Sequence, residues 1–93
     1  MRRIKIGSTY KHFKGGIYKV IDIVYDCESK GEKLDKVVIY QGVNGKKLKW
    51  ARKYEDFCSL VDKEKYPDIK QKYRFELIEH NFEDLSNWQI FLI

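Results

Sequence analysis

The sequence predicts a mostly β protein, a small barrel or roll of about five antiparallel strands with one short helix or turn. Two observations carry this prediction. Residues 17–25 are almost entirely β-branched or aromatic, which favours a strand. Asn44-Gly45 stands between two apolar segments and is a strong hairpin signal. The chain has 93 residues, so it can form one domain with a modest core.

The first half reads as a series of strands. Residues 10–13 are followed by two glycines, which suits a tight turn into the strand at 17–25. We expect this second strand to be the central one. The polar stretch 27–36 predicts an exposed loop, and residues 36–41 predict the strand that enters the Asn44-Gly45 hairpin.

Alternation along the strand after Asn44-Gly45 assigns its faces. Leu48, Trp50 and Arg52 are expected on one face of the strand, and Lys49 and Ala51 on the other.

The second half is less regular. Residues 54–61 place apolar side chains at helical spacing and predict a short helix or turn, and residues 73–78 return to strand character. Residues 79–93 form a C-terminal extension whose pattern fits either a helix or a strand. Its apolar end, with Trp88, Ile90, Phe91 and Leu92, should be covered by the barrel or by a second copy of the chain, as in a homodimer.

Neither a secretion signal nor a membrane-spanning segment is expected, because the N-terminus lacks an apolar run and no stretch approaches ~20 apolar residues. The two cysteines, Cys27 and Cys58, match no metal or redox spacing. They are expected to be unpaired thiols in the cytoplasm, with Cys58 the less accessible because its neighbours are apolar.

Several segments resemble a known family. They are residues 10–20 (YKHFKGGIYKV), residues 37–40 (VVIY), the Trp50-Ala51-Arg52 triplet and the nearby Phe57. Together they are similar to the small bacterial proteins grouped as domain of unknown function 1653. The resemblance covers about residues 7–78 and implies a Src-homology-3-like barrel with no established activity.

The chain departs from that family pattern in four places. Gly7 and Tyr10 stand one residue further apart, and residues 26–29 replace a loop that contains a histidine in the family. Lys53 replaces a proline, and residues 79–93 extend past the usual end.

No catalytic motif, metal site or cofactor site is predicted. The only histidines, His12 and His80, and the two cysteines are too scattered for a zinc site. The glycines lack the spacing of a phosphate-binding loop. One enzymatic alternative stays open, in which His12 activates Cys58 in a small enzyme or enzyme accessory.

Charge favours a binding module over an enzyme. Residues 1–54 carry 14 basic and 5 acidic side chains, net +9, whereas residues 55–93 carry 5 and 9, net −4. Basic and aromatic residues alternate in two segments of the basic half, as at surfaces that bind anionic partners. The expected partner is nucleic acid or an acidic protein segment. The candidate binding residues are Tyr10, His12, Phe13, Lys14, Tyr40, Lys49, Trp50 and Arg52.

Within this set, Tyr10 and His12 are expected to be exposed, and Trp50, together with Tyr18, is expected in the core. Lys63 and Lys65, in the acidic half, are expected to lie away from the binding surface.

Overall fold

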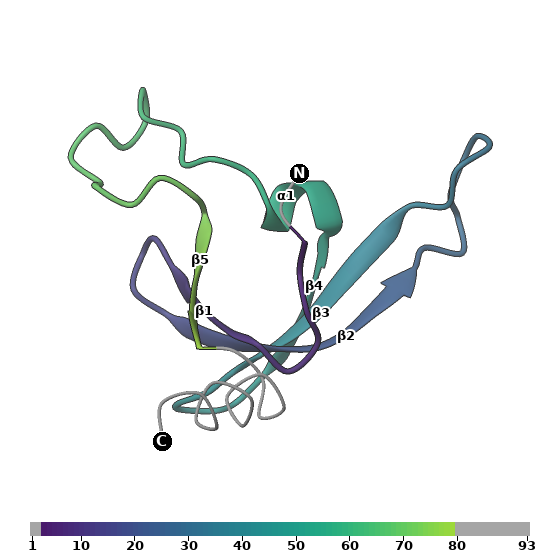
Figure 1. Cartoon of the computed structure of the whole chain (residues 1–93), viewed down its shortest axis with the longest axis horizontal. Helices are drawn as coiled ribbons and strands as arrows, with labels where there is room; N and C mark the ends of the chain where they lie inside the picture. The colour runs from purple at the N-terminus through teal and green to yellow at the C-terminus, as the bar shows by residue number, and fades with distance from the viewer. Residues whose placement is uncertain (1–2, 80–93) are drawn as a thin grey trace, which may run out of the picture.

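The computed structural model describes residues 3–79, which form one antiparallel sheet with one short helix. The strands are β1 (Thr9–His12), β2 (Ile17–Tyr25), β3 (Lys36–Gly42), β4 (Lys49–Lys53) and β5 (Phe75–Glu79), and helix α1 (Tyr54–Phe57) follows β4 directly. Their order is β4-β3-β2-β1-β5, so β2 is central, as predicted. The mostly β fold is confirmed, as an open and strongly bent sheet consistent with a small roll (Figure 1).

Glycines close the two tight turns. Gly15, with a φ of 111°, lies in the β1–β2 turn, where the His12 N–H donates to the Gly16 carbonyl at 2.8 Å. Gly45, with a φ of 69°, lies between β3 and β4, so the predicted hairpin is confirmed. The connection spans residues 43–48 and is longer than a two-residue turn.

Two arms project from the sheet (Figure 1). One is the far end of the β2–β3 hairpin, where residues 26–35 are mostly exposed, as predicted. The other is segment 58–74, which links α1 to β5. Irregular pairing between Val20 and Asp22 in β2 marks a bulge, a feature that bends strands.

The core fills the inside of the bend. Phe57, from α1, stacks on Phe75 with ring centroids 4.0 Å apart and planes 4° from parallel. The buried cluster comprises Ile4, Tyr10, Val20, Val38, Tyr40, Phe57 and Phe75. The helix therefore supplies the cover for the middle of the sheet.

Two expectations about burial were wrong. Tyr10 is 3% exposed, because it lies mid-sheet and packs edge-on against Phe57 at 5.3 Å. Trp50 is 49% exposed, because it lies on β4, the edge strand next to β3, with no further strand to cover it in the described sheet. Tyr18 is half-buried and packs against the core cluster.

Candidate nucleic-acid interface

An aromatic pocket lies on the inner face of the sheet. Its volume is about 220 Å³, and its wall is formed by His12, Tyr18, Tyr40, Trp50, Arg52 and Phe75. Each of the five strands contributes at least one of these side chains. Strand alternation explains the arrangement, since Trp50 and Arg52 are two residues apart on β4 and share a face, as predicted.

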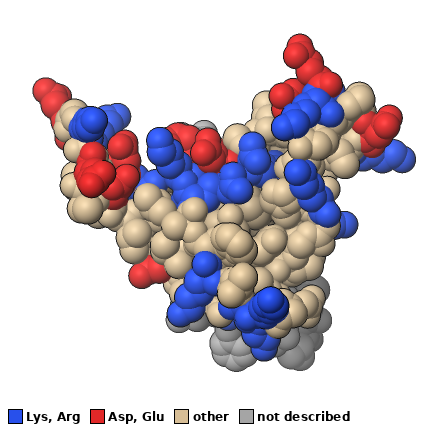
Figure 2. Space-filling model, turned by 180° about the vertical axis from the view of Figure 1, so that it is seen from behind, with Lys and Arg blue, Asp and Glu red and all other residues tan. Residues whose placement is uncertain are grey.

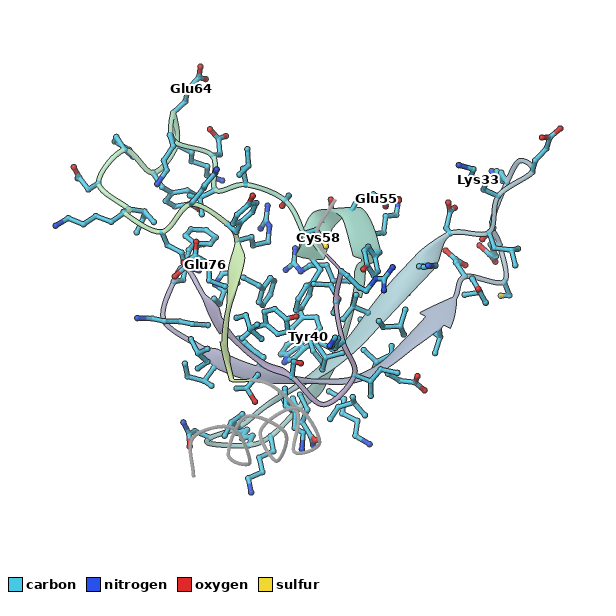
Figure 3. The ribbon with its side chains drawn as sticks, viewed as in Figure 1. Lys33, Tyr40, Glu55, Cys58, Glu64 and Glu76 are labelled. Carbon is cyan, nitrogen blue, oxygen red and sulfur yellow. The ribbon has the colours of Figure 1, made fainter. Side chains whose placement is uncertain are left out.

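Strand register brings the rings together. Tyr40 on β3 is paired with Trp50 on β4, and His12 on β1 is paired with Phe75 on β5. Tyr40 meets Phe75 edge to face, with centroids 5.4 Å apart, and meets Tyr18 in the same way at 5.3 Å. Figure 3 shows Tyr40 inside the bend of the sheet. The pocket is thus a wall of rings held by edge-to-face contacts.

Arg52 brings the positive charge into this pocket. Its Nε–H donates to the Tyr40 hydroxyl at 3.2 Å, and its guanidinium carbon lies 5.8 Å from the centre of the Phe75 ring. No other hydrogen bond of its guanidinium is found within residues 3–79. The terminal nitrogens are therefore available to an acceptor in the pocket.

His12 stands beside Arg52 and is neutral. Its partial burial, followed by the charges of Arg52, Arg74 and Lys14, lowers its pKa to about 4. Its Nδ1 accepts the backbone N–H of Lys14 at 3.1 Å, which assigns the ring proton to Nε2. The imidazole ring packs edge-on against Phe75 at 4.8 Å. At neutral pH this histidine offers a ring and an N–H donor.

A second pocket, which we call the basic pocket, adjoins the first. Its volume is about 370 Å³, and it shares His12 and Arg52 with the aromatic pocket. The full lining is His12, Phe13, Lys14, Arg52, Val61, Asp62, Lys65, Tyr66 and Arg74. Four of these residues are cationic and one is acidic.

Contacts across segment 58–74 hold the cations of the basic pocket in place. The Arg74 Nε–H donates to the Ser59 hydroxyl at 3.0 Å. The Lys14 ammonium lies 5.2 Å from the Tyr66 ring centre, and its hydrogen bond to the Tyr66 hydroxyl lowers the pKa of that tyrosine. Phe13 and Tyr66 pack edge to face at 5.0 Å. The basic pocket is therefore built jointly by the β1–β2 turn and segment 58–74.

A third pocket, the turn pocket, adjoins the aromatic pocket on its other side. Its volume is about 350 Å³, and it shares Tyr18 and Trp50 with the aromatic pocket. The two turns supply the remainder: Gly15, Gly16, Ile17, Gly42, Asn44, Lys46, Lys47 and Leu48. The three pockets are neighbours, with the aromatic one in the middle and lysines or arginines in the lining of the other two, and we refer to the three together as the groove.

Charges are unevenly distributed over the molecule. On the face seen in Figure 2, Lys and Arg side chains lie above and below an uncharged area, while most acidic side chains lie on the two projecting arms or between them, beside basic ones. Glu64, at the end of one arm, extends away from the sheet in Figure 3. An anionic ligand in the groove would therefore meet little opposing charge.

The structure brings six of the eight candidate residues to the groove: His12, Phe13, Lys14, Tyr40, Trp50 and Arg52. Tyr10 is excluded because it is buried beneath Phe57. Lys49 does not line the groove either, since it alternates with Trp50 on β4 and belongs to the opposite face.

Sequence reasoning missed several groove residues: Tyr18, Lys65, Tyr66, Arg74 and Phe75. Lys65 was expected to lie away from the binding surface, and this was wrong because segment 58–74 folds back beside the β1–β2 turn. The one available signal was Arg74-Phe75, a cation next to an aromatic at the start of a strand.

The arrangement of Cys58 gives the enzymatic alternative no support. Cys58 packs against the core and lines neither of the pockets that contain His12. Cys27 and Cys58 do not form a disulfide, and Cys58 is less exposed than Cys27, as predicted. Within residues 3–79 there is no group of three His, Cys, Asp or Glu side chains that would hold a metal ion.

Comparison with known proteins identifies one family. Residues 8–77 match the model described as protein of unknown function (DUF1653), and this range contains every residue that lines the groove. No curated protein and no solved structure matches the chain. Across the described residues, no helix is long and apolar enough to cross a membrane.

Proposed function

Because this chain belongs to the DUF1653 family of proteins of unknown function, and the family segment contains the whole groove, we propose that the domain is a binding module for single-stranded nucleic acid. The observation that carries the proposal is an aromatic pocket with the basic pocket on one side and the lysine-containing turn pocket on the other. Unpaired bases stack on aromatic rings, and the backbone between them is anionic, so both features of the groove have a counterpart in the ligand.

The rings favour a ligand with a planar group. A half-exposed tryptophan, Trp50, and a half-buried tyrosine, Tyr18, line the aromatic pocket and are the rings on which we expect a base to stack. Base–aromatic stacking contributes about 1–3 kcal/mol per base. An acidic protein segment would satisfy the lysines and arginines of the groove but leave these rings without a matching group.

The groove also favours a single strand over a duplex. Bases in a duplex are stacked on one another and present only their edges, whereas a pocket walled by rings accepts a base whose face is free. The groove is bounded by the two turns and segment 58–74. A flexible strand can follow such a path more easily than a rigid duplex.

The proposal is tested by titrating the protein against labelled RNA, single-stranded DNA and duplex of roughly 12 nucleotides, within the site sizes of single-strand-binding barrels. We expect both single strands to bind more tightly than the duplex. Affinity should fall with salt at a log-log slope of about −0.7 for each phosphate contacted.

Matched charge reversals locate the surface. Lys14→Glu with Arg74→Glu changes two cations of the groove, and Lys11→Glu with Lys19→Glu changes two exposed lysines on the opposite face of the same sheet. Net charge changes equally in both variants. The groove variant should bind more weakly and reduce the salt slope by about 1.4 if each cation meets one phosphate. The control variant should keep the slope.

Three outcomes contradict the proposal. Equal losses in the two double variants would mean that binding follows net charge alone. A dissociation constant above ~100 μM at physiological salt would be weaker than ordinary non-specific binding. Competition by a glutamate-rich peptide as strong as that by RNA would instead identify an acidic protein segment as the ligand.

A further inference from the structure

The two ends of the groove differ. The basic pocket contains Lys14, Arg52, Lys65 and Arg74, whereas the turn pocket contains two lysines. The single acid of the basic pocket, Asp62, accepts the backbone N–H groups of Glu64 and Lys65 at 3.0 and 3.4 Å, so its carboxylate is engaged in a local turn. The strongest position for one phosphate is therefore on the segment 58–74 side of the aromatic pocket.

We infer that the aromatic pocket and the basic pocket together form a site for one nucleotide, with the base among the rings and its phosphate among the cations. This inference rests on the proposed function. It adds that one nucleotide is the unit recognised, and it states which pocket takes the base and which takes the phosphate. The two pockets share His12 and Arg52, so they adjoin, and one ligand could contact both of them through these two side chains.

Arg52 is placed to serve both parts of such a ligand. Its Nε–H donates to the Tyr40 hydroxyl and its guanidinium carbon lies 5.8 Å from the centre of the Phe75 ring, which positions the guanidinium between the two pockets that it lines. The terminal nitrogens can then donate to a base edge on one side or to a phosphate oxygen on the other. Arg74, tied to Ser59, adds a second guanidinium on the phosphate side.

His12 gives this site a built-in reporter. Partial burial, and after it the nearby cations, lower its pKa to about 4. A phosphate bound among Lys14, Arg52 and Arg74 would offset their positive charge and make the imidazolium easier to form. The pKa of His12 should therefore rise when a phosphate occupies the basic pocket, and should change little when only a base is bound.

Nuclear magnetic resonance on the full-length, isotope-labelled chain tests the layout with three probes. Uridine 5′-monophosphate should shift the Trp50 and Tyr18 signals and also raise the pKa of His12. Uridine should shift the Trp50 and Tyr18 signals without raising the His12 pKa, and inorganic phosphate should raise the His12 pKa without shifting the Trp50 and Tyr18 signals. Uridine monophosphate should bind more tightly than either fragment.

Two variants separate the pockets. Trp50→Ala should weaken uridine monophosphate binding by at least about fivefold, the lower end of the range for base stacking, while the His12 pKa still rises at saturating phosphate. Arg74→Gln should reduce the phosphate-induced rise and leave the uridine-induced ring shifts intact. Lys11→Gln with Lys19→Gln, on the opposite face, is the control and should behave as the unmodified chain. Thermal melts exclude loss of folding as the cause.

The nucleotide site is overturned if uridine monophosphate only raises the His12 pKa, or only shifts the Trp50 and Tyr18 signals, because the pockets would then not act on one ligand. The oligonucleotide titration run in parallel distinguishes the two proposals. Tight oligonucleotide binding without a response to the mononucleotide would reject the nucleotide site alone. Failure of both ligands would reject the proposed function as well.

Discussion

Gly16 has no side chain and so leaves room for the Tyr18 ring, which lines the groove. A Cβ atom at this position would lie 2.6 Å from Cε2 of Tyr18 and 2.8 Å from its hydroxyl oxygen. The φ angle of Gly16 is not among the positive ones, so alanine suits its backbone. Gly16→Ala should therefore push the Tyr18 ring aside, lower oligonucleotide affinity, and change the melting temperature little, as both titration and thermal melts can measure.

Gly15→Ala is the matched control. Gly15 has a φ of 111° and no atom within 4 Å of the position of an added Cβ, so the substitution strains the backbone without touching Tyr18. We expect about 1–2 kcal/mol of lost stability and unchanged affinity. Unchanged affinity in Gly16→Ala would show that Tyr18 takes no part in binding.

The depressed pKa of His12 predicts a pH dependence of stability. The pKa is about 4 in the folded chain against an ordinary 6.5, so the unfolded chain binds more protons between these values. The contribution of this histidine to the free energy of unfolding should be fully present above pH 6.5, and the free energy of unfolding should decline as the pH falls from 6.5 toward 4. Comparing denaturant unfolding of the unmodified chain and His12→Gln at pH 7 and 4.5 isolates this residue, and the variant should lose less stability. Parallel profiles would contradict the prediction.

At the residue scale, the alternation of side chains along a strand predicts which face of the sheet each one lies on. It does not predict whether other residues bury that face. The sequence correctly places Trp50 with Arg52 on one side of β4, and it does not reveal that β4 is an edge strand. Tyr10 is buried because Phe57, 47 positions further along the chain, packs on it. Burial of these aromatics depends on partners distant in sequence, which a local pattern does not contain.

At the element scale, the tight turns were predictable and segment 58–74 was not. The turns follow from local residue chemistry, Gly15-Gly16 and Asn44-Gly45. Segment 58–74 is held by long-range bonds, such as the Gln71 side-chain amide donating to the Lys11 carbonyl at 2.9 Å. It carries Lys65, Tyr66 and Arg74 to the groove, so half of the basic pocket escaped prediction.

Lys63 organises this segment from within. Its ammonium donates to the backbone carbonyls of Ile69 and Gln71, the latter at 2.9 Å. Lys63→Gln should loosen the segment, giving faster amide exchange and proteolysis there and weaker oligonucleotide binding, with only a small change in global stability. Lys70→Gln, an exposed lysine of the same segment, is the control. Equal exchange rates in the two variants would refute this role.

At the scale of the whole molecule, the distribution of charge along the sequence differs from its distribution in the folded structure. The division into a basic and an acidic half places Lys65 and Arg74 in the acidic half, yet both line the basic pocket. Glu64, on the same segment, extends away from the sheet (Figure 3). The composition shows an excess of basic residues, and only the fold shows which of them line the same pocket.

The C-terminal extension, residues 79–93, allows one to test whether the stability of the domain and its binding of oligonucleotides depend on different parts of the chain. The expected cover for Trp88, Ile90, Phe91 and Leu92 lies outside the described residues and stays a prediction. Near the end of β5, the last described strand, Leu77 and Ile78 are 42% and 53% exposed. Because both β5 and the extension carry such apolar residues, this end of the chain is a candidate for packing or self-association.

Deleting residues 82–93 should therefore lower the melting temperature or shift the oligomeric state seen by gel filtration. Oligonucleotide affinity should be retained, because every groove residue lies between positions 12 and 75. The truncated chain must first be shown to fold, by circular dichroism typical of a β protein. A folded truncation with an unchanged melting temperature and elution volume would show that the extension is not needed for either property. Loss of binding in a folded, monomeric truncation would show instead that the groove needs the extension to be complete.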